Sequence, residues 1–256
     1  MNQHFSDTTL PVNTRAQART VMCLPLDKLP SRKGRDEKFP EINGYRVKNI
    51  WGSVTVEGQL WWRHQMILNL LFNCYEQVIG EKGSVSVKVG LYSLLKKLGY
   101  DHPSVKDARW LVKRIQELWE ATVTFEFEGE QPVRTRIIYE IEGLNGTGWD
   151  SSIVFHFTSR YCNFMRSKQA MFLSEERLLR LHKLPALVQA AVWHMMSHKV
   201  GGQASLGNLV GALISLNNSQ RTTQRRIKQL RQHADEMAEF GVVVDGDIVR
   251  HAGMAI

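Results

Sequence analysis

The sequence predicts an α+β protein in which two similarly organised domains follow an N-terminal tail. After residue 44 the expected elements occur twice in the same order: an apolar helix, a short extended piece, a compact helix, a helix with a basic face and a β-hairpin. Hydrophobic residues make up 43% of the 256-residue chain, enough to bury the cores of two ordinary domains. The expected boundaries are 1–44 for the flexible tail, 45–148 for the first domain and 149–256 for the second.

Composition and charge narrow the class of protein. The net charge of +8 favours a polyanionic partner. Cys23, Cys74 and Cys162 are too far apart to suggest a disulfide framework or a thiolate metal site, which fits a reducing cytoplasm. The polar N-terminus lacks the apolar segment of a secretory signal, and no apolar run is long enough to cross a bilayer. We therefore expect a cytoplasmic protein with no membrane partner.

The first 44 residues show no sustained helical or strand period. They contain four prolines and the charged run Ser31–Lys38, and their seven Lys or Arg nearly balance five acids. This pattern predicts a flexible, solvated tail, with a DNA-contacting arm as the alternative.

The first domain begins with a small expected hairpin, Tyr45–Ile50 and Ser53–Val56. A buried helix is expected over Leu60–Val78, because apolar residues recur there near helical spacing. Ser84–Val89 alternates as a brief strand, and Leu91–Leu98 follows as a short amphipathic helix.

The best-defined helix of this domain starts at Ser104, where Asp107 three residues later completes a capping arrangement. One apolar stripe then runs from Ala108 to Trp119. Two extended runs, Thr122–Glu128 and Val133–Ile141, follow as a hairpin. This order of elements is that of a winged helix-turn-helix domain, in which one helix reads DNA and the hairpin forms the wing.

The second domain repeats this order after the loop Gly143–Gly148, and the strand Ser152–Phe157 reopens regular structure. Pro185 begins an apolar helix that runs to about Lys199. The other expected elements are a compact helix over Leu206–Ser215, a turn and cap at Asn217-Asn218-Ser219, a long helix over Gln220–Phe240, and the strands Val242–Val244 and Ile248–Arg250 around an Asp245-Gly246-Asp247 turn.

The segment from Asn218 to Ala234 has a directed positive face. It contains five basic residues and no acid, and its apolar stripe around Ile227 lies opposite the basic side chains. Arg and Gln side chains pair bidentately with guanine and adenine edges in the major groove. A solvated helix face is the alternative, although such faces normally intersperse acids. The predicted DNA contacts here are Arg221, Gln224, Arg225, Arg226, Lys228, Arg231 and Gln232.

The first domain carries a weaker counterpart of this basic helix face. Its helix presents basic residues opposite the apolar stripe, and two arginines alternate onto one face of its hairpin, where a wing meets phosphates. Ordinary exposed charges are the alternative for both groups. The predicted contacts are Lys106, Arg109, Lys113, Arg114, Arg134 and Arg136.

Catalytic motifs are weak or incomplete. The glycine-rich segment Gly143–Gly148 lacks the lysine of an ATP-binding loop. His194 and His198 have the i, i+4 spacing of a zinc peptidase, but Met195 occupies the place of its glutamate. A DNA-nicking enzyme that uses Tyr161 is a further alternative, although only one histidine, His156, lies nearby. We expect no enzymatic activity, no metal and no cofactor.

The chain resembles the iteron-binding plasmid replication initiators, especially the TrfA-like and RepC-like proteins. The matching stretches are LYSLLKKLGY, RWLVKRIQELWEATVTFEF, LHKLPALVQAAVWHMMSHK and RTTQRRIKQLRQ. The resemblance implies two winged helices that straddle each double-stranded origin repeat, with the third helix of the second domain as principal reader. It also implies origin melting without ATP hydrolysis and recruitment of a replicative helicase, with host initiation proteins as further partners. A transcriptional regulator or autorepressor is the runner-up, and a monomer and a dimer both remain open.

Overall fold

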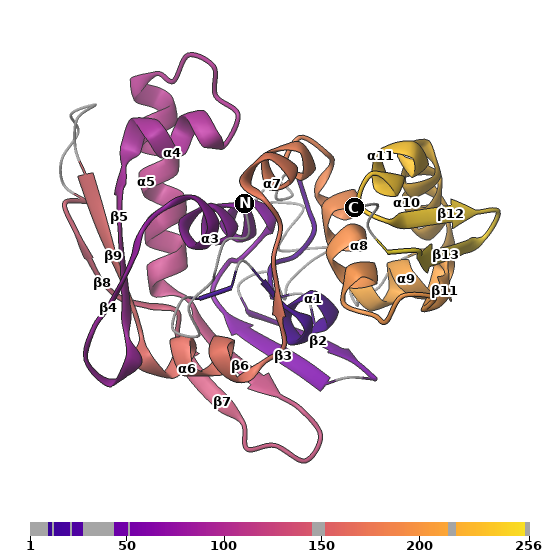
Figure 1. Ribbon diagram of the computed structural model, residues 1–256, viewed down its shortest axis with the longest axis horizontal. Helices are drawn as coiled ribbons and strands as arrows, with labels where there is room; N and C mark the ends of the chain where they lie inside the picture. Colours follow the sequence, from indigo (N-terminus) through magenta and orange to yellow (C-terminus); the bar gives the residue numbers. More distant parts are fainter. Residues whose placement is uncertain are drawn as a thin grey trace.

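Antiparallel sheets and helices alternate along the protein. The computed structural model describes residues 10–11, 13–20, 22–27, 44–50, 52–144, 152–214 and 219–253. Its strands form four antiparallel sheets, and the helices pack between and around them (Figure 1). The protein is therefore α+β, as the sequence predicts.

The first four-stranded sheet joins two predicted hairpins. Its order is β2 (Gly44–Asn49), β3 (Gly52–Glu57), β6 (Thr122–Glu126) and β7 (Val133–Arg136). Alternate residues of these strands are buried, because successive side chains of a strand point to opposite faces of the sheet. The face turned to the core is apolar, so the opposite face is left for charged and hydroxyl side chains.

The second four-stranded sheet has the order β4 (Gln77–Ile79), β5 (Val85–Gly90), β9 (Ser152–Phe157) and β8 (Ile138–Glu142). Only the fully buried Ile137 separates β7 from β8, so the single strand predicted over residues 133–141 is wrong. The chain leaves one sheet there and enters the other. Strand β9, which was expected in the second domain, pairs with β5 and β8 of the first.

Three helices cover these sheets in the first half of the chain: α3 (Trp62–Cys74), α4 (Leu91–Lys97) and α5 (Val105–Glu120). A short 3-10 turn, η2 (Glu81–Gly83), precedes β5. The capping arrangement predicted for α5 is confirmed, because the Asp107 amide donates to Ser104 Oγ at 3.4 Å and the Ser104 amide donates to Asp107 Oδ2 at 2.8 Å. This cap sets the start of the helix and thereby the direction of its faces.

Three elements between β9 and residue 185 were not predicted. They are α6 (Ser159–Ser167), β10 (Ala170–Met171) and α7 (Glu175–Leu181). The sequence does carry signals for the two helices. Thr158 and Ser174 accept hydrogen bonds from backbone amides three residues later, and two acids follow Ser174 in the first turn.

The C-terminal part follows the predicted order closely. It contains α8 (Ala186–Met196), β11 (Gln203–Ser205), α9 (Leu206–Leu213), α10 (Gln220–Gln232), α11 (Ala234–Ala238), β12 (Val242–Asp245) and β13 (Ile248–His251). The last three strands form a sheet of order β11-β13-β12, and the predicted Asp-Gly hairpin joins β12 to β13. The helix expected over residues 220–240 is interrupted at His233, whose φ of −113° and ψ of 24° are not helical. The turn expected at Asn217 and Asn218 lies outside the described residues.

The N-terminal segment is not a tail in its described part, so that expectation is corrected for residues 10–27. Leu10, Met22 and Leu24 are each only 1% exposed. Strand β1 (Asn13–Thr14) pairs with β10, and α1 (Arg15–Thr20) packs against α8 and α9. Figure 1 shows α1 at the centre of the molecule, between the two large sheets and the C-terminal elements. The segment is ordered because its few apolar residues meet partners far away in the sequence.

Leu24→Ala is expected to lower the free energy of unfolding by about 2 to 5 kcal/mol, the usual cost of truncating a buried leucine. Urea denaturation would measure the change. The matched control is Val200→Ala at a valine that is 67% exposed, which is expected to stay within about 0.5 kcal/mol of the wild type. Equal stability of the two variants would mean that the N-terminal segment does not pack in solution.

Candidate nucleic-acid interface

Helix α10 has the two-faced character that the sequence predicts. Ile227 and Leu230 are buried on its inner side. Ser219 caps the helix by accepting a hydrogen bond from the Thr222 amide at 3.3 Å, so no acid is needed in the first turn. The exposed predicted contacts recur at i, i+3, i+4, i+7 and i+11 and therefore share one face. They are Arg221, Gln224, Arg225, Lys228 and Gln232.

The two other predicted contacts of α10 are Arg226 and Arg231. Arg226 is half-buried, and its Nη1 has no hydrogen-bond partner among the described residues. Burial, with a smaller effect of the neighbouring Arg225 charge, lowers the pKa of this guanidinium. Arg231 reaches back to the β12–β13 turn, where it donates to the Gly246 carbonyl at 3.2 Å and lies 3.3 Å from Asp247 Oδ1. Arg231 therefore ties the helix to the hairpin.

Three of the four predicted DNA contacts of helix α5 are exposed. Lys106, Arg109 and Lys113 are exposed on one side of the helix, and Leu111 is buried on the other. Within the described part of the chain, none of these three cations forms an ion pair with an acid, and the nearby Asp107 carboxylate is hydrogen-bonded to Ser104. The positive face of α5 is thus available to a polyanion.

Arg114 is corrected from a DNA contact to a buried structural residue. It is 8% exposed, and its Nη2 lies 2.7 Å from Glu117 Oε1. The guanidinium also lies over the rings of Trp61 and Trp110, at 5.6 and 5.9 Å from the ring centroids. The other oxygen of Glu117 lies 3.1 Å from His64 Nε2, so the three charged or polar groups form one network.

The hairpin arginines lie on the outward face of the first sheet. Both are exposed, and Arg134 donates to both carboxylate oxygens of Glu57 at 2.9 Å. Strand β2 adds Arg46 and Lys48 to the same outward face, and these were missed. The sequence does indicate their exposure, because Arg46 and Lys48 alternate with apolar residues along β2.

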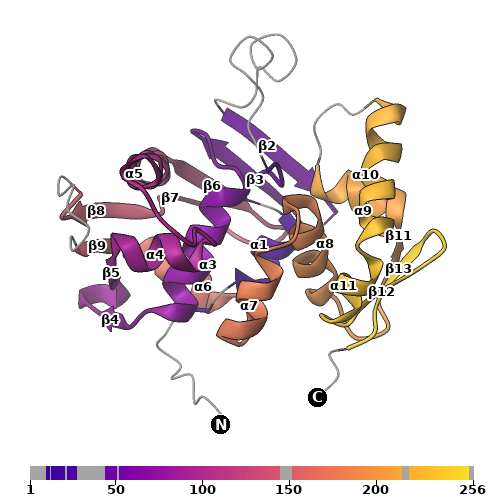
Figure 2. The same ribbon diagram turned by 90° about the horizontal axis from the view of Figure 1, so that it is seen from above.

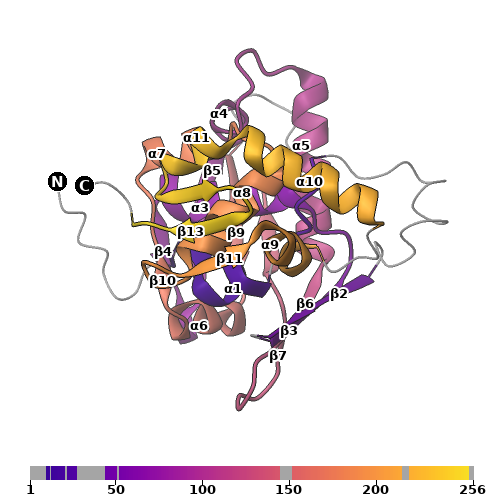
Figure 3. The same cartoon turned by 90° about the vertical axis from the view of Figure 1, so that its right-hand side faces the viewer.

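The two basic helices lie on the same side of the molecule. Figure 2 shows α5 and α10 at opposite ends, both in the upper half of the view with β2 between them. In Figure 3, which is turned about another axis, α5, α10 and β2 again lie on one side, away from both termini. Both basic helices therefore lie on the side of the molecule that holds β2.

The residues of the enzymatic alternatives are placed unfavourably for catalysis. Tyr161 is fully buried, and its hydroxyl accepts a hydrogen bond from Gln17 at 3.1 Å. Burial raises the pKa of this phenol, so the nucleophilic phenolate form is hardly populated at neutral pH. His194 is 3% exposed and its Nδ1 lies 3.2 Å from the Ala18 carbonyl, and burial lowers its pKa to about 4.

The described part of the chain holds no group of three or more His, Cys, Asp or Glu side chains placed to bind a metal ion. None of its helices is both long enough and apolar enough to span a membrane.

The comparisons with known proteins identify a fold and no family. No protein-family model matches the sequence, and no curated protein matches it. Among solved structures, the chain is similar to a selenomethionine derivative of domains 2 and 3 of RctB, with a TM-score of 0.60 and 8% identity over 94% of this chain and 99% of that chain. A second crystal structure of RctB domains 2 and 3 aligns with a TM-score of 0.47 and 12% identity, over 80% of this chain and 88% of that chain. The chain therefore shares the fold of domains 2 and 3 of RctB.

Proposed function

We propose that the protein is a sequence-specific binder of double-stranded DNA that initiates replication at origin repeats. The observation that carries this proposal is the exposed, acid-free Arg and Gln face of α10. Helix α5, which bears a second group of exposed cations, lies on the same side of the molecule. RctB, whose domains 2 and 3 share the fold, is a replication initiator of Vibrio chromosome II. Both points support an initiator over a binder of unrelated polyanions.

We interpret the C-terminal part as a winged helix. Helix α8, strand β11, helices α9 and α10 and the β12–β13 hairpin follow each other in the order of that motif, and β13 lies between β11 and β12. In this interpretation α10 enters the major groove. Its Arg and Gln side chains read base edges there, while the β12–β13 wing meets the flanking backbone.

The first half supplies a second contact in the same proposal. Helix α5 and the β6–β7 hairpin take the places of reading helix and wing, with Lys106, Arg109 and Lys113 against phosphates. The exposed Lys48 and Arg136, beside Arg134 and Arg46 that are paired with Glu57 and Glu126, then extend the contact along the duplex. Two contacts on one face fit repeated sites in which each unit spans more than one groove.

Opening of the origin, recruitment of a replicative helicase and contacts with host initiation proteins belong to the proposal as expected steps. The protein acts in them by binding DNA rather than by its own catalysis. The two contacts do not require a dimer, because both basic helices belong to one chain.

DNase I footprinting on the DNA that flanks the protein's own gene tests the proposal. We expect protection of several directly repeated sites beside an AT-rich segment, and permanganate reactivity of that segment when the sites are filled. Protection of a single palindrome without strand opening would instead establish the regulator. Binding with no sequence preference at physiological salt would contradict both.

A further inference from the structure

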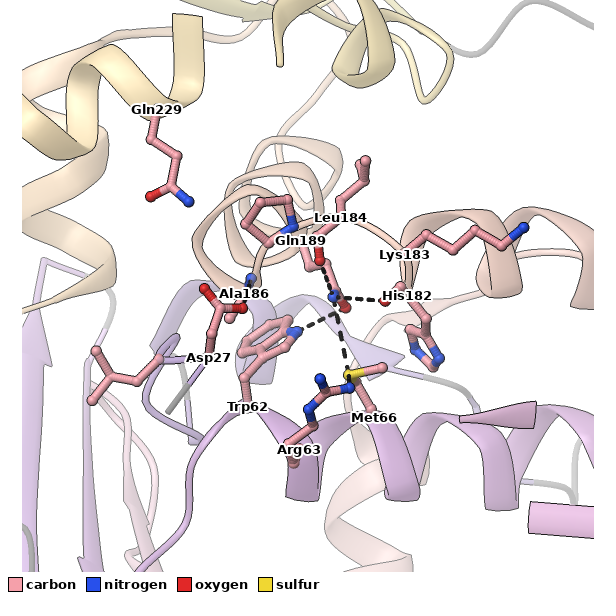
Figure 4. Close-up of a pocket in the computed structure, with 12 residues that line it drawn as sticks. Asp27, Trp62, Arg63, Met66, His182, Lys183, Leu184, Ala186, Gln189 and Gln229 are labelled. Atoms are coloured by element: carbon pink, nitrogen blue, oxygen red, sulfur yellow. Dashed lines mark hydrogen bonds between the residues drawn. The ribbon is translucent and has the colours of Figure 1, made fainter. Parts of the chain in front are cut away.

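Helix α8 is held at both ends by the N-terminal segment (residues 10–27). At the start of the helix, Asp27 Oδ1 accepts the Ala186 amide at 2.8 Å, and Figure 4 shows this carboxylate beside Ala186. At the other end, Arg19 Nη2 donates to the Ser197 carbonyl at 2.8 Å and Arg19 Nε donates to Ser197 Oγ at 3.3 Å. A helix carries partial positive charge at its N-terminus and partial negative charge at its C-terminus. The acid and the arginine of one segment therefore match the charges of the two ends of α8.

Arg19 also bonds to the first half of the chain. Its backbone carbonyl accepts a hydrogen bond from Asn49 Nδ2 at 2.5 Å, and Asn49 is the last residue of β2. Strand β2 pairs with β3, and β3 pairs with β6, the strand that follows α5. One residue therefore joins the sheet connected with α5 to the end of α8.

The residues on either side of Arg19 show the same division. The Ala18 carbonyl lies 3.2 Å from His194 Nδ1 in α8. The Met22 carbonyl accepts a hydrogen bond from the Tyr45 hydroxyl of β2 at 2.5 Å. The N-terminal segment thus lies between the two halves and bonds to each, in agreement with the central place of α1 in Figure 1.

The two ends of α8 meet the first half of the chain in different ways. Near the start of α8, Trp62 of α3 donates directly to Gln189 Oε1 at 2.8 Å. The C-terminal end of α8 is joined to the first sheet through Arg19. Gln189 and Ser197 are about 12 Å apart along the helix axis, so loss of the Arg19 bonds would leave α8 able to turn about its start. Helix α10 packs against α8 and would turn with it.

We propose that Arg19 is a positioning residue that fixes the C-terminal part (α8 to β13) against the first half of the chain and thereby sets the spacing of the DNA sites that the protein accepts. This inference rests on the proposed function, which assigns α5 and α10 to two segments of one DNA site. Two contacts on a rigid body strengthen each other only when both segments lie at the matching distance and on the matching face of the duplex. A rigid connection therefore favours one spacing, whereas a loose connection accepts several spacings with lower affinity for each.

Distances between two spin labels test the role of Arg19 without DNA. Gln116→Cys in α5 and Ala238→Cys in α11 provide exposed label sites outside the proposed DNA contacts, and Cys74→Ser removes the one native cysteine that is not buried. Double electron–electron resonance on the full chain should give a single narrow distance distribution in this background. Adding Arg19→Ala should broaden the distribution, because the C-terminal part then takes several orientations. A distribution that stays as narrow as in the background would overturn the proposal.

The matched control is Arg15→Ala in the same helix. Within the described part of the chain, the Arg15 side chain makes no hydrogen bond or ion pair, so this variant should keep the narrow distribution. Asn49→Ala removes the other side of the connection and should broaden the distribution as Arg19→Ala does. The double variant should add little to either single variant, since both remove the same connection. Broadening by Arg15→Ala, or full additivity of the other two, would show that Arg19 does not act as the bridge.

Gel-shift titrations with altered sites test the consequence for DNA. Footprints of Lys113→Ala and Arg225→Ala first assign the two segments of the site to α5 and α10. Insertion of about 5 base pairs between these segments turns one of them to the opposite face of the duplex, since a helical turn is about 10.5 base pairs. The wild type should lose at least about 10-fold in affinity on the lengthened site, because one of two linked contacts is lost. Arg19→Ala should bind the unchanged site more weakly than the wild type and lose less than about 3-fold on the lengthened site.

Failure of this inference and failure of the proposed function give different results. If the wild type shows no sequence-specific binding, the proposed function is overturned and Arg19 has no role in DNA spacing, while the label distances still decide whether Arg19 fixes the C-terminal part. If the wild type binds specific DNA but tolerates the lengthened site as well as Arg19→Ala does, the spacing role is overturned and the proposed function stands.

Discussion

Replacing Arg221, Arg225 and Lys228 together by alanine is expected to lower affinity for the specific DNA site by at least about 100-fold. One bidentate arginine–guanine pair alone contributes about 1 to 3 kcal/mol of discrimination, and each 1.4 kcal/mol is a factor of about ten in affinity. The three side chains are exposed on one face of α10, and Ile227 holds the opposite face in the core. Fluorescence anisotropy with a labelled duplex at several salt concentrations measures both affinity and its salt dependence.

The salt dependence distinguishes loss of phosphate contacts from loss of base contacts. Each phosphate contact removed should reduce the slope of log affinity against log salt by about 0.9. A base contact removed should leave the slope unchanged and flatten the preference at one base pair. The control replaces Lys88, Lys96 and Lys199 by alanine, which changes the net charge equally on other exposed surfaces. If the control loses as much affinity as the α10 variant, the binding reflects net charge and α10 is not the reader.

Arg114→Ala is expected to lower the free energy of unfolding by about 3 kcal/mol, because removal of one partner leaves a buried charge uncompensated. The side chains of Arg114 and Glu117 are only 10% and 17% exposed, and His64 is the remaining neighbour of the Glu117 carboxylate. Thermal and urea denaturation measure this change. At temperatures where the variant is folded, its DNA affinity should match that of the wild type.

The neighbouring Lys113→Ala gives the opposite result in the same assays. Lys113 is exposed, so its truncation should change stability by no more than about 0.5 kcal/mol and should weaken DNA binding. Comparison of the Arg114→Ala and Lys113→Ala variants distinguishes a role in stability from a role in DNA contact at adjacent positions of α5. If Arg114→Ala keeps full stability and loses affinity, the guanidinium leaves its buried site to reach DNA and the assignment made here is wrong.

The elements best predicted from the sequence are those whose signals are local. The cap at Ser104 and the apolar spacing after it define α5, and the acid-free run around Ile227 defines α10. The Asp-Gly turn at Asp245 fixes the C-terminal hairpin for the same reason, because a two-residue turn and its flanking strands specify each other. The exposed faces of both helices follow directly from the 3.6-residue period.

Arg114 was misassigned although the sequence held the information. It lies three residues after Leu111 and four before Leu118, so the helical period itself places it on the buried side. Its charge suggested a surface position. Burial is possible only because Glu117 and two tryptophan rings surround the guanidinium, and Trp61 comes from outside the helix.

The remaining errors concern strand pairings that the local sequence does not specify. The sequence around Ile137 does not indicate that β7 and β8 join different sheets. Strand β7 pairs with β6, which precedes Ile137, whereas β8 pairs with β9, which follows it. The N-terminal residues look like a polar tail because the partners of β1 lie more than 150 residues later in the sequence. Local propensity carries no record of such contacts, and only the assembled core shows them.

The position of the N-terminal segment has a consequence for how the chain matures on the ribosome. Asn13 pairs with Met171, and α1 packs against α8, so these partners emerge more than 150 residues later. At about 5 to 20 residues per second, this delay is roughly 8 to 30 s. Strand β1 and helix α1 therefore lack these partners on the nascent chain during that time, whereas Met22 and Leu24 can already bond to Tyr45 and Leu60.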